Sequence, residues 1–334
     1  MLSSRARLPS LIWLLPAVAY LFTQASAQSA NPASFGPIQT RNHHPLYTGL
    51  LYPAPESGTT VKKITFNTAL NYTNIFVFDN EGRSSAFIDK ELAELDLSIR
   101  YPLADGKVEI GAEAPFYSSS TGFMDGAVRW YHGRLGIPGY EGQAVIPDYT
   151  YSDVIRRDGK PVMRGARDQG ALGDASFWIK AEIFSKGPLT VSLQGLTQAP
   201  TGNADRGEGS GEWEFGARAL ATILAEKFAV HLGGGGISPG RVKRSLATTS
   251  LNNMLTGFIS YERFVSGRFR LLIQSMFNTS PFEDSDLERF RKRWIEATFG
   301  FKYQLKSGTI LAVGFSENLN RTAPDFTIHF SLEK

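Results

Sequence analysis

Strict alternation of apolar and polar residues, sustained for about ten residues at a time, constrains the fold of this chain more than any other feature. In the clearest example, residues 90–101, every second residue from position 93 onward is apolar and the intervening ones are Glu94, Asp96, Ser98 and Arg100. A period of two is that of a β-strand whose two faces meet different environments. This stretch therefore predicts a strand with one apolar and one polar side.

The same pattern recurs through the rest of the chain. Further alternating segments begin near residues 107, 174, 189, 212, 228, 255, 269, 295, 311 and 326, and a weaker one lies near residues 63–70. The count of about twelve is even, and the connections alternate between long and short, starting with a long one after residue 70. These features are typical of an all-β protein, a transmembrane antiparallel β-barrel of the bacterial outer-membrane type. A soluble β-sandwich is the alternative, but it would not predict the rhythm of the connections.

Composition agrees with a barrel. Hydrophobic residues make up 42% of the chain and the mean hydropathy is −0.18, which are values typical of soluble proteins. A membrane-spanning barrel can have these values because only every second residue of a strand faces lipid. Beyond the N-terminal region no run of apolar residues is long enough for a membrane helix. The net charge of +3 gives no indication of a nucleic-acid partner. The absence of cysteine excludes disulfides, so stability must come from burial and hydrogen bonds.

The N-terminus has the three-part form of a secretory signal peptide. Two arginines precede an apolar run over residues 8–22, and the small residues Ala25-Ser26-Ala27 follow. We predict a signal peptide over residues 1–27 and a mature chain that begins at Gln28. A retained membrane anchor is the alternative, but the apolar run is short and contains two prolines. We therefore expect a location in the outer membrane of a Gram-negative bacterium, with outer-membrane lipid and the outer-membrane assembly machinery as partners.

Residues 28–61 precede the first strand of the barrel, which spans residues 62–334, and are not strand-like. They could lie in the periplasm or enter the lumen as a plug. The adjacent His43 and His44 are by themselves a weak signal for a metal, so we predict no metal site and no cofactor.

Residues 117–173 form a long extracellular loop, and loops of this length are usually functional or disordered. Apolar residues recur within it at helical spacing. Two positions are open for such a helix: it could dip into the barrel and narrow it, or lie outside. In the first case the loop would gate the lumen. The candidate gating residues are Met124, Arg129, Tyr131 and His132.

The polar faces of the strands predict a charged lumen. The lumen-lining candidates are Glu94, Asp96, Glu109, Glu113, Arg218, Arg268 and Arg270. If the short turn pairs Lys107 with Arg100, Glu113 falls opposite Glu94. Carboxylates so placed must take up protons, bind cations or face arginines. Pairing with the arginines across the lumen is the favoured interpretation, because a barrel of this size has little room for unpaired charges. Free carboxylates would instead favour cations.

Three stretches carry a resemblance to a known family: Gly36 to Leu46 (GPIQTRNHHPL), Asn71 to Phe76 (NYTNIF) and Gly170 to Asp174 (GALGD). At these the chain resembles a bacterial outer-membrane family catalogued as domain of unknown function 3187. The resemblance implies a barrel and carries no assigned activity. Gly173-Asp174 and Pro200-Thr201-Gly202 are also similar to barrels that pass small aromatic compounds. The last residues, Leu332-Glu333-Lys334, depart from the aromatic ending usual in such barrels.

The leading functional hypothesis is a narrow channel or uptake pore for an unidentified small-molecule solute. A structural or assembly barrel without transport is one alternative, since a barrel alone implies no function. An outer-membrane lipid-modifying enzyme, such as a lipid hydrolase, is the other. It is disfavoured because His231 and His329 point inward by the alternation, and no serine lies in a nucleophile motif. We therefore predict no enzymatic activity and assign no catalytic residue.

Overall fold

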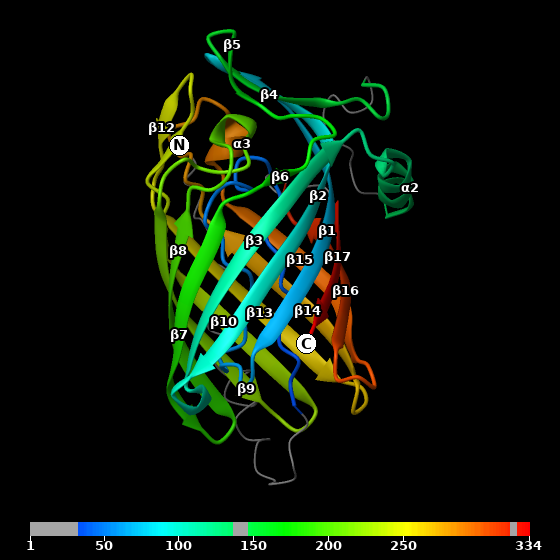
Figure 1. The fold of residues 1–334 in the computed structure, drawn as a ribbon. Coiled ribbons are helices and arrows are strands. Elements are labelled where there is room, and N and C mark those ends of the chain that lie inside the picture. Colours follow the sequence, from blue (N-terminus) through cyan, green and yellow to red (C-terminus); the bar gives the residue numbers. More distant parts are fainter. Residues whose placement is uncertain (1–32, 136–145, 321–325) are drawn as a thin grey trace, which may run out of the picture.

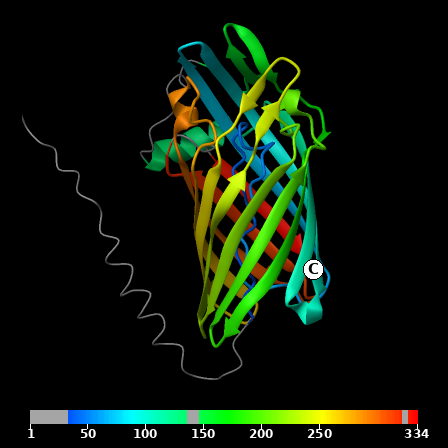
Figure 2. The same ribbon diagram turned by 90° about the vertical axis from the view of Figure 1, so that its left-hand side faces the viewer.

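The computed structural model describes residues 33–135, 146–320 and 326–334. Twelve long strands form a closed antiparallel barrel in which each pairs with the next along the chain and the last pairs with the first (Figures 1 and 2). They are β1 (Thr65–Glu81), β2 (Ser84–Leu103), β3 (Val108–Ser120), β7 (Ala175–Lys186), β8 (Leu189–Ala199), β9 (Glu214–Leu224), β10 (Phe228–Ser238), β13 (Met254–Phe264), β14 (Phe269–Asn278), β15 (Trp294–Gln304), β16 (Ile310–Asn318) and β17 (Phe326–Glu333). The predicted fold class is confirmed.

The remaining elements are short and lie in the connections. They are η2 (Ala104–Gly106), α2 (Asp125–Leu135), β4 (Ser152–Arg157), β5 (Lys160–Arg164), β6 (Ala171–Leu172), η4 (Ala204–Arg206), β11 (Arg241–Lys243), β12 (Thr248–Ser250) and α3 (Glu288–Arg291). All but η2 lie at the end of the barrel that carries the long loops (Figure 1). The opposite end carries short turns, which in barrels of this type face the periplasm. Among the described residues, no helix is long and apolar enough to cross a membrane.

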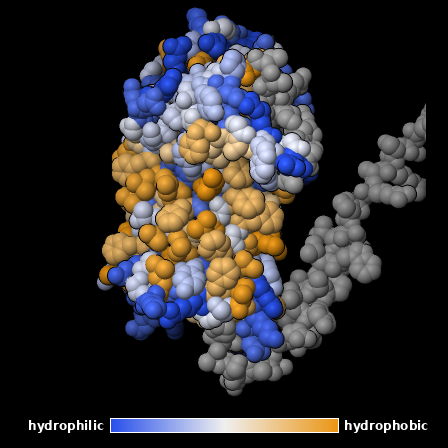
Figure 3. All heavy atoms as spheres, turned by 90° about the vertical axis from the view of Figure 1, so that its right-hand side faces the viewer, coloured by the Kyte–Doolittle hydropathy of each residue, from blue (hydrophilic) through white to orange (hydrophobic). Residues whose placement is uncertain are grey.

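The alternation seen in the sequence becomes the inside and the outside of the wall. On β2, Leu95, Leu97 and Ile99 are exposed, whereas Glu94 is fully buried. Figure 3 shows the consequence on one face of the molecule: a hydrophobic band crosses the middle of the barrel, and hydrophilic residues lie above and below it. The exposed apolar side chains are those that face lipid in a membrane-spanning barrel.

A charge on this band should be costly. Leu97→Arg places a cation on the lipid-facing side of β2, where Leu97 is 42% exposed, and we expect it to destabilise the barrel by roughly 2–4 kcal/mol. Ser98→Arg is the matched control, because Ser98 faces inward, opposite Asn67 and Glu113. The yield of folded barrel, measured as heat-modifiable gel mobility, should fall more for the first variant. Equal yields would contradict the assignment of the two faces of β2 or of their environments.

One predicted connection is wrong. The first hairpin has only Gly82 and Arg83 between its strands, so residues 71–89 are strand and not a long loop. The hairpin continues beyond the apolar band, where β4 pairs with β2 and β5 pairs with β4. Apolar and polar residues do not alternate in this part of the hairpin, because both faces carry apolar side chains. The inward residues Ile75 and Val77 are buried in an apolar cluster, and the outward positions between and after them are phenylalanines.

The segment before β1 occupies the lumen. Near the short-turn end Ser34 bonds Glu262 of β13, the chain then rises to a turn at residues 44–50, and it returns so that Thr60 bonds Gly106. Residues 40–52 are all buried. We call residues 33–61 the plug. The sequence left two positions open for residues 28–61, the periplasm and the lumen. The described part of this segment lies in the lumen. The predicted signal peptide and Gln28 lie outside the described residues.

Helix α2 lies outside the wall. Just before it, Phe123 stacks on Tyr72 with ring centroids 5.2 Å apart, and Asn74 donates a hydrogen bond of 3.0 Å to Asp125 of the helix. Tyr72 and Asn74 share the outward face of β1 with Leu70, which is 46% exposed. The helix therefore does not dip into the barrel, whose lumen the plug already fills.

The candidate gating residues accordingly lie away from the lumen. Met124 is buried beneath the loop, and Arg129 pairs with Asp148 of the same loop. The ring of Tyr131 is 5.8 Å from that of Phe326. The side chain of His132 lies outside the described residues.

Candidate functional site: the plug and its contacts in the lumen

The ascending arm of the plug is held by a buried carboxylate. Glu94 of β2 forms an ion pair of 2.6 Å with Arg41 and a short contact with Nε2 of His43, and it accepts a 3.2 Å hydrogen bond from Asn71 of β1. All four residues are buried. A charge removed from water in this way is stable only when partners surround it, so the wall and the plug each depend on the other at this point.

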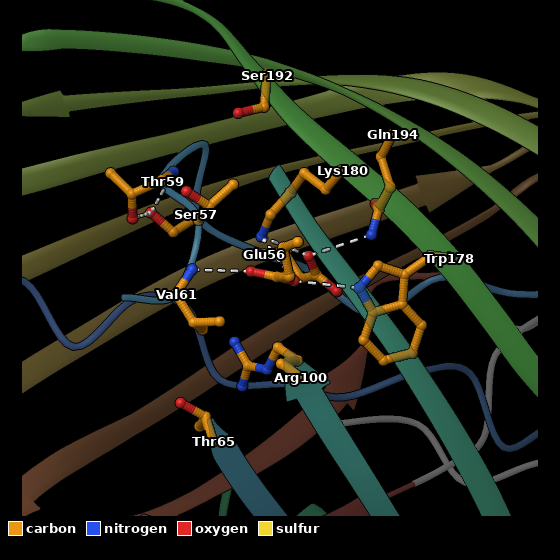
Figure 4. Close-up of polar contacts among 12 residues, drawn as sticks. Glu56, Ser57, Thr59, Val61, Thr65, Arg100, Trp178, Lys180, Ser192 and Gln194 are labelled. Carbon is orange, nitrogen blue, oxygen red and sulfur yellow. Dashed lines mark hydrogen bonds and ion pairs between the residues drawn. The ribbon is translucent and has the colours of Figure 1, made fainter. Parts of the chain in front are cut away.

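The returning arm is held by a second carboxylate, this time from the plug (Figure 4). Glu56 lies 3.1 Å from Nζ of Lys180 and 3.4 Å from Arg218 of the wall, and it accepts a hydrogen bond from Gln194. Arg218 also donates to the carbonyl oxygen of Ala54, at 2.7 Å. Here the wall supplies the cations and the plug supplies the anion, the reverse of the arrangement at Glu94.

Glu109 links the same cluster to the start of the wall. It lies 3.3 Å from Lys180 and accepts hydrogen bonds from the backbone N–H of Val61, at 2.9 Å, and from Nε1 of Trp178, at 3.1 Å. Lys180 thus lies between two carboxylates, one on the plug and one on the wall. Such bridging contacts position the chain where it leaves the lumen.

A fourth buried carboxylate, Glu262 of β13, binds the N-terminal end of the plug. Glu262 accepts a hydrogen bond from Ser34 and one of 2.8 Å from the backbone N–H of Phe35. The Nε2 atom of His231 lies 3.2 Å from Glu262 and 3.3 Å from Oγ of Ser34. Although these residue types occur in hydrolases, both contacts use one ring nitrogen. A triad needs the carboxylate on one nitrogen and the serine on the other, so this arrangement does not support the enzyme alternative.

Neutral groups complete the attachment of the ascending arm. Gln274 of β14 accepts from the backbone N–H of Ile38 and donates to its carbonyl oxygen. His329 contacts Thr40 at 3.0 Å. Two inward glycines, Gly300 and Gly314, make room for the plug: a Cβ atom at either position would lie 2.6 or 3.0 Å from Cδ1 of Ile38.

The turn of the plug closes the extracellular end of the lumen with an apolar cluster. Leu46, Tyr47, Leu50 and Leu51 are at most 7% exposed. They pack with aromatic and aliphatic residues of the wall and the loops, among them Phe258, Met276, Phe282, Leu287, Phe290 and Trp294. The lumen is thus sealed by hydrophobic contacts at its outer end and by ionic contacts below.

The structure brings most of the predicted lumen residues inside. Glu94, Glu109, Arg218 and Arg270 are buried, and Asp96 and Glu113 are half-buried on the inner face. The prediction for Arg268 is wrong. This residue lies exposed in the turn, one residue before β14 begins, where side chains do not yet alternate between the two faces of the wall.

The predicted register and partners also differ. Glu113 lies opposite Ser98, and Glu94 lies opposite Tyr117. Glu94 is paired with Arg41 of the plug, and Glu109 with Lys180 of the wall. Among the described residues, neither Asp96 nor Glu113 forms an ion pair with a cation. Arg41 and His43 were not predicted to bind Glu94, and Glu56 was not predicted at all. The only signal in the sequence was that these polar residues fall in a segment without strand periodicity.

Another outer-membrane protein of known structure has a similar fold. The fold is similar to that of a crystallised outer-membrane channel of Pseudomonas putida F1, with a TM-score of 0.57, 14% identity, and coverage of 85% of this chain and 99% of that one. A Pseudomonas aeruginosa FadL homologue has a TM-score of 0.42 at 11% identity, covering 90% of this chain and 99% of its own. The toluene transporter TbuX of Ralstonia pickettii has a TM-score of 0.40 at 11% identity, covering 83% and 90%. No curated protein matches the sequence.

A closed twelve-stranded barrel with an apolar belt and an internal plug defines an outer-membrane β-barrel with an occluded lumen. Residues 14–334 match the family described as Protein of unknown function (DUF3187), and the chain belongs to that family.

Proposed function

We propose that this protein is a gated outer-membrane channel, which admits a small solute when its plug rearranges. The observation that carries the proposal is that the plug is separable from the wall. Within the described residues the plug shares no strand pairing with the barrel, and side chains and isolated backbone groups hold it. The wall's own hydrogen bonds would therefore survive movement of the plug.

The likeness of fold to a crystallised outer-membrane channel supports the proposal. So does the size of the barrel, because twelve strands enclose more space than their own side chains fill and leave a narrow lumen once a plug moves. The acidic residues Glu94 and Glu109 are paired with cations, so a preference for cations is not part of the proposal.

A reversible crosslink between plug and wall tests the gating. Oγ of Ser57 in the plug lies 3.0 Å from Oγ1 of Thr222 on β9, close enough for a disulfide between cysteines at these positions. Because the chain contains no cysteine, the variant Ser57→Cys/Thr222→Cys carries no competing thiol. In planar bilayers the oxidised variant should stay closed, and reduction should restore the openings of the wild type.

The two single-cysteine variants are the controls, since neither can form the crosslink. Openings that are equally frequent in the oxidised and reduced double variant would contradict a role for the returning arm. No conductance from any of these proteins would favour the alternative of a structural barrel.

A further inference from the structure

A cavity of about 320 Å³ opens among the extracellular loops, above the turn of the plug. Its floor is apolar and is built from Leu46 of the plug together with Ile155, Phe282, Leu287 and Phe290, none more than 9% exposed. The volume is that of roughly ten water molecules and is at the lower end for ligand pockets. A small molecule in this cavity would contact the plug directly.

The rim of the cavity is charged. Three arginines line it, Arg156, Arg157 and Arg244, against two aspartates, Asp284 and Asp286. The aspartates do not neutralise the arginines. Asp286 already accepts hydrogen bonds from Oγ of Ser84, at 3.0 Å, and from the backbone N–H of Arg83, at 3.3 Å. Asp284 is exposed to solvent.

Two of the arginines have unused donors. In the part of the chain that the structure describes, the half-buried side chain of Arg156 makes no hydrogen bond or ion pair. Arg244 is also half-buried, and its Nε donates to the carbonyl oxygen of Ala204 at 2.9 Å. No described group accepts a hydrogen bond from its two terminal amino groups.

The surroundings of Arg244 fit an absent anion. Burial lowers the pKa of Arg244 to about 10, so the side chain remains charged at neutral pH although it is partly removed from water. Asp205 partly offsets this effect, but its carboxylate is already bonded to the backbone N–H and the hydroxyl of Ser245. A cation in this situation gains from an anionic ligand that supplies charge-assisted hydrogen bonds.

We propose that this cavity binds a small amphipathic carboxylate, with its apolar body on the floor around Leu46 and its head group at Arg156 and Arg244. An amphipathic cation would leave the arginines unpaired, and a fully polar anion would leave the apolar floor in water. That the ligand is the transported solute rests on the proposed channel function. Binding itself does not, because the cavity is open while the plug is in place.

Binding of radiolabelled octanoate to the protein in phosphatidylcholine nanodiscs tests the site, with empty nanodiscs subtracted. We expect Arg156→Gln/Arg244→Gln to weaken binding about tenfold or more, since each arginine would contribute a charged hydrogen bond. Arg134→Gln/Arg164→Gln is the matched control and should bind as the wild type does. It removes two exposed arginines from the same end of the molecule, and neither lines the cavity.

Equal affinity of wild type and Arg156→Gln/Arg244→Gln would overturn the site, as would octylammonium competing as well as unlabelled octanoate. Heat-modifiable mobility checks assembly. If the double variant fails to assemble, Arg156→Gln alone serves, because this side chain has no bond to lose. Octanoate flux into proteoliposomes, in excess of the flux into protein-free liposomes, separates the two proposals. Binding without excess flux supports the site and contradicts transport of this ligand, whereas excess flux without binding contradicts only the site.

Discussion

Replacing Glu94 with alanine should free the ascending arm of the plug. The substitution leaves Arg41 and His43 buried in the lumen without their carboxylate. Breaking a buried ion pair by removing one partner costs about 3–5 kcal/mol, because the remaining charge is uncompensated. We expect this cost to appear as local opening of the plug, since the backbone hydrogen bonds that join the wall strands do not involve the Glu94 side chain, whose only bond within the wall, among the described residues, is the one from Asn71.

A buried thiol in the plug measures this opening. Thr48 is 6% exposed, and Thr48→Cys can react with a membrane-impermeant maleimide only when the plug opens. Adding Glu94→Ala should accelerate labelling roughly a hundredfold or more, the rate equivalent of the expected cost. Glu288→Ala is the control, because the Glu288–Lys292 pair is exposed and such pairs contribute little. The same labelling rate with either substitution would show that Glu94 does not hold the plug.

The wall could be predicted from the sequence because each of its strands separates lipid from a polar lumen, and that separation repeats every second residue. The register could not. The turn between β2 and β3 contains η2, in which Ala104 and Asp105 have positive φ, and Arg100 consequently pairs with Gly111 and not with Lys107. A shift of this kind changes which carboxylates meet without changing either strand's alternation.

The plug could not be derived from local pattern. Its backbone is irregular, so no periodicity marks it, and its contacts join residues far apart in the chain: Ser34 and Glu262 are 228 positions apart. Glu94 and Arg218, two of the residues expected to line the lumen, are paired with charges of the plug. The partners were missing from the prediction because Arg41 and Glu56 lie in a segment whose position was open.

Removing the plug should turn the closed barrel into an open one. Deleting residues 34–58 leaves every strand pairing of the wall intact, because β1 begins at Thr65. Lys180, Arg218 and Glu94 then lose their partners on the plug and keep those on the wall, and the emptied lumen admits water, which solvates them. Water thus replaces the lost partners, and the free-energy cost of an unpaired buried charge does not arise. The apolar cluster at the outer end also loses its central residues, so no seal remains there.

Conductance of this deletion variant in planar bilayers is the most direct test of the claim that the plug closes the lumen. We predict a steady open conductance, against rare openings of the wild type, with normal heat-modifiable mobility. Deletion of α2, Asp125–Leu135, is the control and should conduct as the wild type does, because the helix packs on the outer face of the wall. A plug-deleted barrel that assembles normally and conducts no more than the wild type would contradict the account.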